Sequence, residues 1–256
     1  MISVDSRSGE SLVLRKLIDK AEQAYYNNFP TNTQFLDLNE QNIFMKHIKE
    51  FPSIKYNMFG GNDICERKMI MFFPRDFQAD QISFPICALH IKNNSSSDKL
   101  NHRDYLGALM SLGIERFKLG DVVCNDQSAY VFCVDTLTDY ILEQLIMIKS
   151  TAVTVDRVEM SHVKHIEPRF DVIKGSVSSL RLDSILKLGF SLSRGNSTLL
   201  IQSGKAFINN KLYEKNSAKV EEGDVISLRG FGKLKIHTIG DYTKKGRIYL
   251  ELFKYK

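Results

Sequence analysis

At 256 residues the chain is long enough for two or three domains, each with room to bury a core. Its first residues lack the basic start and apolar stretch of a signal peptide, and no apolar run approaches the ~18 residues of a membrane-spanning helix. We therefore expect a cytoplasmic protein without membrane insertion. The four cysteines contain no C-x-x-C pair, which argues against a structural zinc site or a redox dithiol, so we expect no metal and no cofactor.

Charge is distributed unevenly along the chain. The formal net charge is +5, but residues 175–256 hold 15 Lys and Arg against 7 Asp and Glu, a balance of +8, which leaves −3 for residues 1–174. Such asymmetry favours a polyanion-binding module joined to a nearly neutral body. The alternative is an ordinary solvated basic face, which accounts less well for basic residues that fall at helix starts and turns.

Residues 1–77 predict an N-terminal α+β domain that is mostly helical. Leu17 lies on the apolar face of an early helix, and Asn39 can cap a second helix that runs through Glu50. Residues 55–73 favour a hairpin. This region shows no motif that indicates a catalytic or ligand site.

Residues 78–160 predict a middle domain with the element order βαββαβ, typical of a ferredoxin-like or RRM-like sandwich with both helices on one sheet face. Asn101 can cap the first helix, and a second helix is expected over residues 135–148. Tyr130 and Phe132 share one face of the third strand. Because the glycine-and-basic signature of an RNA-binding RRM strand is missing, we favour packing of these rings against the two helices over stacking on RNA.

Residues 161–176 predict a linker. His162 and His165 lie there at helical spacing, but they lack the further ligands that a metal site needs. We therefore place no metal site in this segment.

Residues 177–256 predict two short helices and a strand, followed by a small antiparallel sheet. Ser178 and Ser179 can cap the first helix, and Ser193 can cap the second. Arg194 then falls in the first turn of the second helix, where a cation opposes the helix dipole. An external anion such as phosphate explains this position better than helix stability does.

The same stretch resembles the S-four RNA-binding domain, which is named after a small-subunit ribosomal protein. That family opens its first helix with R-L-D and its second with S-R, and the end of the second helix and the strand after it read I-x-x-G-K-x-x-x-N. The matching residues here are Arg181-Leu182-Asp183, Ser193-Arg194, Ile201, Gly204, Lys205 and Asn209. Two departures, Ser197 in place of a packing Ala and Asn210 in place of Gly or an aromatic, bear on the shape of the turn.

Over its whole length the chain resembles the YlmH-type proteins. The resemblance rests on FGGNDICERKMIMFFP at 59–74, HRDYLGALMSLGIERFKLGDVV at 102–123, VSSLRLD at 177–183, and RGFGKLKI with TKKGR near the end. It implies a ribosome-associated RNA-binding protein. By analogy with compact relatives of the same domain, it implies contact with large-subunit rRNA and with a tRNA that carries a nascent chain, in translation rescue and quality control. The family also has a link to cell division, which we regard as indirect.

We therefore expect a nonenzymatic RNA-binding factor. The expected phosphate contacts are Arg181, Arg194, Lys205 and Lys211, and the groups expected to bond near ribose or backbone are Ser193, Thr198 and Asn209. Two alternatives stay open, an accessory part of an RNA-modifying enzyme and a cell-division-linked scaffold that holds a protein partner through its first two domains. The R-L-D at 181–183 matches a pseudouridine synthase triplet, but the SILKLGF that follows predicts a helix and not the strand of a synthase.

Overall fold

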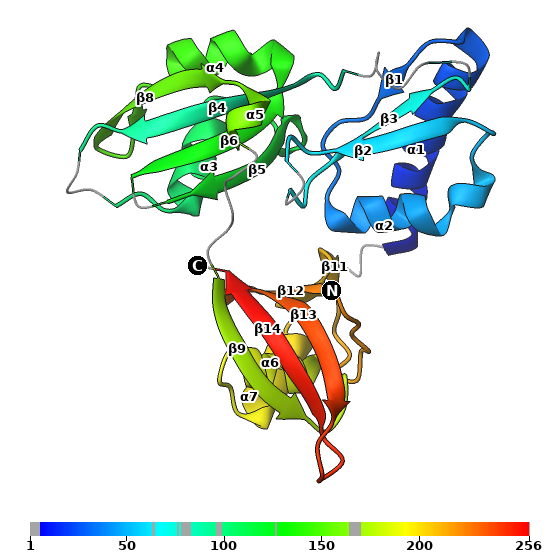
Figure 1. The fold of residues 1–256 in the computed structure, drawn as a ribbon, viewed down its shortest axis with the longest axis vertical. Coiled ribbons are helices and arrows are strands. Elements are labelled where there is room, and N and C mark those ends of the chain that lie inside the picture. The colour runs from blue at the N-terminus through cyan, green and yellow to red at the C-terminus, as the bar shows by residue number, and fades with distance from the viewer. Residues whose placement is uncertain are drawn as a thin grey trace. The chain divides into compact units, whose positions relative to one another are not determined.

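The computed structural model describes residues 6–62, 65–75, 77, 83–95, 99–125, 127–163 and 170–255. The chain separates into two compact units, residues 1–167 and 168–256 (Figure 1). Both units combine helices with antiparallel strands, so the fold class is α+β, as predicted. Within the described residues, no helix is long and apolar enough to cross a membrane.

The N-terminal part of unit 1 packs two helices against a three-stranded sheet of order β1-β3-β2. Leu17 and Phe44, one from each helix, are buried with Phe72 of the central strand. The hairpin predicted over residues 55–73 is confirmed. The elements are α1 (Ser6–Asn27), β1 (Thr31–Asn32), α2 (Leu38–Lys46), a 3-10 turn (Ile48–Glu50), β2 (Lys55–Phe59) and β3 (Met69–Phe73).

Helix α2 begins at a different cap from the one predicted. Asp37, and not Asn39, is the N-cap residue: its carboxylate accepts from the Glu40 amide at 2.9 Å, and the Glu40 carboxylate accepts from the Asp37 amide at 2.8 Å. This reciprocal capping box satisfies two amides at once, which a single Asn cap does not. Burial raises the pKa of Glu40.

The middle part of unit 1 is a five-stranded antiparallel sheet of order β5-β6-β4-β8-β7. Its first strand lies between the third and fourth strands of the βαββαβ order, which is the ferredoxin-like arrangement predicted. The elements are β4 (Ile86–Asn93), α3 (His102–Ser111), a 3-10 turn (Arg116–Lys118), β5 (Leu119–Cys124), β6 (Ser128–Val134), a 3-10 turn (Asp135–Leu137), α4 (Thr138–Gln144), β7 (Met147–Ile148), β8 (Thr151–Val158) and α5 (Met160–Val163).

Two helix predictions in this part have different outcomes. Asn101 caps α3 as expected, because its side chain accepts from the Arg103 amide at 2.9 Å and Asp104 completes a capping box. The helix predicted over residues 135–148 is wrong beyond Gln144. Its last residues form β7, which pairs with the start of β8, so a strand partner replaces the helical hydrogen bonds there.

The two faces of the five-stranded sheet are covered by different layers. Val131 of β6 lies in the core with Tyr105 of α3 and Ile141 of α4. Phe132 points the other way and is buried with Phe35 and Met69 of the N-terminal part. The prediction that Tyr130 and Phe132 pack against the two helices is therefore wrong, because the N-terminal part covers this second face.

Polar contacts reinforce the joint between the two parts of unit 1. Arg67 donates through Nε to the Leu119 carbonyl at 3.0 Å and through Nη2 to the Phe35 carbonyl at 2.7 Å. Arg116 donates to the carbonyls of Leu119 and Gly120 at 2.7 and 3.0 Å. Burial lowers the pKa of Arg116 to about 10, with a smaller contribution from the neighbouring Arg67 cation. The Arg67 guanidinium satisfies buried carbonyls of both parts and so helps to fix how they meet, whereas the Arg116 bonds lie within the middle part.

Unit 2 places two helices on one face of a six-stranded sheet of order β11-β10-β12-β13-β14-β9. Figure 1 shows its long strands side by side in front of the helices. Strand β9 occupies the second half of the stretch predicted as a linker and forms one edge of the sheet. The elements are β9 (Phe170–Val177), α6 (Leu182–Gly189), α7 (Arg194–Gln202), β10 (Ala206–Ile208), β11 (Lys211–Leu212), β12 (Val225–Leu228), β13 (Gly232–Tyr242) and β14 (Ile248–Tyr255).

Candidate nucleic-acid interface

Helix α6, which carries the R-L-D pattern, begins later than predicted. Ser178 and Ser179 do not cap it; Arg181 is the N-cap residue, with an extended backbone at φ −120° and ψ 147°. This extended stretch pairs with the loop before β12, since Leu182 donates to the Ala218 carbonyl at 2.9 Å. The loop therefore sets the helix start, which the local serines cannot do.

Arg181 is tied to a buried carboxylate. Its Nε and Nη2 donate to Oδ1 and Oδ2 of Asp183 at 3.1 and 2.9 Å, and this bonding raises the pKa of Arg181. The Asp183 side chain is only 5% exposed, against 37% for Arg181, and the Ser184 amide also donates to it at 2.9 Å. A carboxylate held in this way by its own domain supports the helix start.

Helix α7 begins as predicted. Ser193 is the N-cap residue, and its Oγ accepts from the Asn196 amide at 3.1 Å. The carbonyl of Ser193 accepts from the Ser197 hydroxyl at 3.0 Å, and Ser197 is fully buried. A serine at this packing position is thus accommodated because its hydroxyl has an internal acceptor.

The first turn of α7 is open to an anion. Arg194 is exposed, and a Cβ added at Gly195 would meet no atom within 4 Å. The first amides of a helix have no acceptor within the helix, and the helix dipole favours negative charge beside them. An exposed cation beside such amides is suited to a phosphate group.

The β10–β11 hairpin turns at two asparagines, as predicted. Asn209 and Asn210 have φ values of 49° and 64°, the left-handed pair that a tight two-residue hairpin requires. The Asn209 side chain donates to Oδ1 of Asp224 at 2.7 Å and accepts from the Val225 amide at 2.9 Å. Its polar atoms therefore already hold the turn onto the neighbouring loop, while Lys211 extends from the exposed side of the hairpin.

One residue that the sequence did not indicate links the two helices. The carbonyl of Asn216 accepts from the Asp183 amide at 3.3 Å, and its side chain donates to the hydroxyl of Thr198 at 3.5 Å. Asn216 thereby connects the start of α6 with the first half of α7. It lies in a loop between exposed Lys215 and Lys219 and has no local pattern that could have indicated this role.

The predicted site residues consequently fall into two groups. The helix-start group, at the N-caps of α6 and α7 and on the first half of α7, consists of Arg181, Ser193, Arg194 and Thr198; the hairpin group, after the end of α7, consists of Lys205, Asn209 and Lys211. The nine residues of α7 span roughly 13 Å at 1.5 Å per residue. The two groups therefore lie apart along α7, in keeping with contacts along a polymer.

Comparisons with known proteins place this geometry in a family. Residues 79–162 match the family described as "Putative RNA-binding domain in YlmH", and residues 180–226 match the S4 domain. The protein of Bacillus subtilis (strain 168) named "Ribosome-associated protein quality control protein P2" is 30% identical over 215 residues, which cover 84% of this chain and 83% of that protein. The chain belongs to the YlmH family.

A solved structure also resembles this YlmH-family chain. It is titled "Cell division protein ylmH from Streptococcus pneumoniae", has 17% sequence identity and a TM-score of 0.50, and the match covers 64% of this chain and 97% of that one. At this identity the likeness concerns the fold alone. The S-four match on residues 180–226 contains both the helix-start group and the hairpin group.

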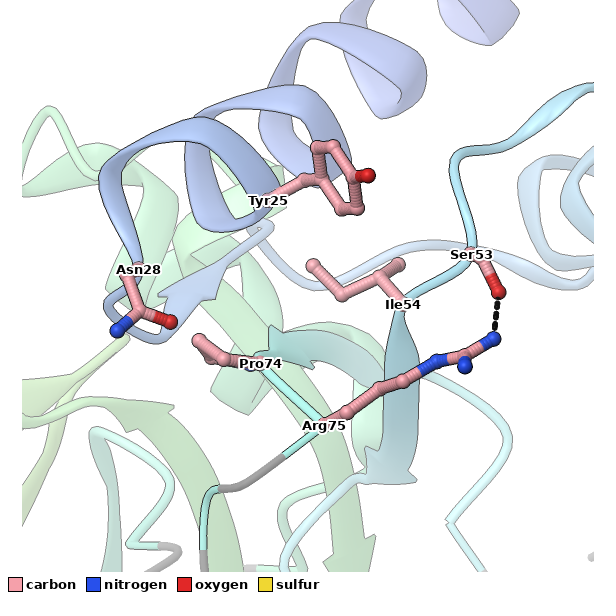
Figure 2. Close-up of a pocket in the computed structure, with 6 residues that line it drawn as sticks. All are labelled: Tyr25, Asn28, Ser53, Ile54, Pro74 and Arg75. Carbon is pink, nitrogen blue, oxygen red and sulfur yellow. Dashed lines mark hydrogen bonds between the residues drawn. The ribbon is translucent and has the colours of Figure 1, made fainter.

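A pocket in unit 1 lacks the side chains that most catalytic and metal sites use. It encloses about 290 Å³ between the end of α1 and the residues that flank β2 and β3 (Figure 2). Its lining is Tyr25, Asn28, Ser53, Ile54, Pro74 and Arg75, and the Arg75 guanidinium bonds the Ser53 hydroxyl. This lining contains no carboxylate, histidine or cysteine. Across the described residues, no group of three or more His, Cys, Asp or Glu side chains could hold a metal ion.

Proposed function

We propose that this protein is a nonenzymatic, cytoplasmic, ribosome-associated RNA-binding factor. The observation that carries the proposal is the open first turn of α7, where exposed Arg194 stands beside helix amides suited to phosphate. The excess of +8 over residues 175–256 supports a polyanionic partner.

The ribosome is proposed as a partner because of the name of the Bacillus subtilis relative. The name of the 30% identical protein states ribosome association and quality control, and the match extends over most of both chains. We therefore propose that the helix-start and hairpin groups engage large-subunit rRNA and tRNA during rescue of stalled translation. The phosphate contacts would come from Arg194, Lys205 and Lys211, with Arg181 contributing through the exposed part of its side chain.

Sucrose-gradient sedimentation with RNA crosslinking in cell extract tests the proposal. The variant is Arg194→Ala with Lys205→Ala, because both side chains are exposed and Arg181 also supports the fold through Asp183. The matched control is Lys244→Ala with Lys245→Ala, which removes two exposed cations from the β13–β14 turn of the same unit.

Wild type and control should sediment with the large ribosomal subunit and crosslink to rRNA and tRNA, and the variant should lose both properties. Sedimentation of wild type only with soluble proteins, without specific RNA crosslinks, would reject the ribosome-factor role and favour a scaffold that holds a protein partner.

A further inference from the structure

The face of the six-stranded sheet that points away from α6 and α7 carries a row of rings. Leu234 and Ile236 of β13 and Leu252 of β14 lie in the core beneath the helices. Because side chains alternate along a strand, Phe253 projects from the opposite side, which we call the outer sheet face. His237 lies at a register shift of β13 and is on the same side, because its ring stacks on Phe253.

The rings on the outer sheet face are stacked across three strands. His237 of β13 stacks on Phe253 of β14 with 3.9 Å between ring centroids and 17° between planes. Phe253 also stacks on Phe170 of β9 at 5.1 Å and 25°, and Phe170 meets Tyr255 edge-on at 5.0 Å. His237 is exposed, and the other three rings are half-buried, so part of each ring surface faces outward. We call these four residues the ring row.

Cations lie beside the ring row. Lys233 Nζ lies 5.2 Å from the centroid of the Tyr255 ring, and Lys235 is the cross-strand neighbour of Phe253. The carboxylate of Glu251 on the same face is already paired with Lys174 at 2.9 Å. The charged groups named on this face, Lys174, Lys233 and Lys235 against Glu251, therefore sum to a positive charge.

Stacked rings flanked by lysines suit one class of ligand. Every nucleobase has a π face that stacks on an aromatic ring, and the phosphates between bases pair with neighbouring cations. A base in a duplex is covered by its own neighbours and cannot lie on such a row, whereas an unpaired base can. An acidic peptide would satisfy the lysines but would leave the flat ring surfaces without a matching partner.

We propose that the outer sheet face is a second RNA-binding surface that takes unpaired nucleotides by stacking on the ring row. The proposal deepens the proposed function and rests on it: the helix-start and hairpin groups hold phosphates of folded RNA, and the outer sheet face holds a single-stranded segment of the same RNA class.

Photocrosslinking of the wild-type full chain tests this proposal without any variant. The probe is a labelled single-stranded oligouridylate of roughly ten nucleotides, within the usual range of site sizes for single-stranded RNA. Ultraviolet crosslinks mapped by peptide mass should fall on the β13 and β14 peptides that contain His237, Phe253 and Tyr255. Crosslinks confined to peptides of α6, α7 and the β10–β11 hairpin would overturn the second surface.

Binding measurements then separate the two surfaces. His237→Ala with Lys235→Ala should lower affinity for the oligouridylate by about tenfold, the usual loss when one stacked base is released, and should change affinity for an RNA duplex of equal length by less than about twofold. Arg194→Ala should weaken duplex binding. Tyr242→Ala is the matched control, because Tyr242 is an aromatic of the same strand that is 71% exposed and outside the ring row.

The thermal midpoint of each variant checks that it is folded. Unchanged oligouridylate affinity in a folded His237→Ala, Lys235→Ala variant would reject the second surface and leave the proposed function standing. Ribosome sedimentation that survives loss of Arg194 and Lys205 would reject these two residues as the contacts, whereas sedimentation of wild type only with soluble proteins would reject the proposed function itself.

Discussion

Replacing Arg194 with Ala should change RNA binding and stability in opposite directions. Arg194 is the first residue of α7 and is exposed, so its truncation removes no buried contact. A cation at this end opposes the helix dipole, and its removal should stabilise unit 2 by about 0.3–1 kcal/mol. For a domain of this size, about 0.5 kcal/mol corresponds to a rise of about 2 to 4 °C in Tm.

The loss of RNA affinity follows from counterion release. Each phosphate contact contributes about −0.7 to −0.9 to the slope of log K against log salt, and four to six contacts give a wild-type slope of roughly −3 to −5. Removal of one contact should therefore flatten the slope by about 0.7 to 0.9. At 0.1 M salt this corresponds to an affinity loss of about five- to eightfold, and the two proteins should converge as salt approaches 1 M.

Fluorescence anisotropy with a labelled RNA duplex over a salt series measures the slope, and thermal unfolding measures Tm. Lys244→Ala is the matched control, since it removes an exposed cation of the same unit outside both site groups. An equal loss of affinity at every salt concentration would refute the phosphate contact. A drop in Tm would show that Arg194 supports the helix, which would contradict an open first turn.

Three further measurements probe the packing of the two units. Ile201→Ala should lower the free energy of unfolding of unit 2 by about 2–5 kcal/mol in urea, because Ile201 is fully buried. A much smaller loss would show that neighbouring side chains fill the cavity. The Lys149 ammonium, 2.7 Å from Asp104, lowers the pKa of that carboxyl below its ordinary value of 3.8. The resulting stabilisation is present above about pH 4 and is lost as pH falls through the lowered pKa. The urea midpoints of wild type and Lys149→Ala should therefore differ at pH 6 and converge in acid. A constant difference between the two midpoints would refute the pairing. Burial raises the pKa of the Cys133 thiol to about 12, so at pH 8 this thiol should react with a disulfide reagent only when the protein unfolds. Peptide mapping that finds Cys133 labelled in the folded protein would contradict this expectation.

Local patterns in the sequence determined the elements that depend on a few adjacent residues. Ser193 caps α7 and Asn101 caps α3, because a cap bonds an amide two or three residues away. The turn at Asn209 and Asn210 is likewise local, since only a few residue types adopt two successive left-handed conformations. The βαββαβ order was also predicted correctly, because alternation and break residues mark its elements.

The basic residues of the candidate interface could be chosen from sequence, but their grouping could not. Exposed Arg194 and Lys205 lie where the motif predicts, at opposite ends of α7. The bond of Arg181 to buried Asp183 makes that arginine part of the helix start as well as a candidate RNA contact. Asn216 joins the two helices from a distant loop, and pairing across such a distance leaves no periodic signal in the sequence.

Only the tertiary structure decided which layer covers each sheet face. Alternation shows that Tyr130 and Phe132 share a face, but it does not say whether helices, the N-terminal part or solvent covers that face. The same limit applies to the ring row, whose members come from β9, β13 and β14 and meet only because those strands pair. A sequence pattern fixes which residues lie together along one element, whereas contacts between elements depend on how the whole chain satisfies its buried apolar and polar groups.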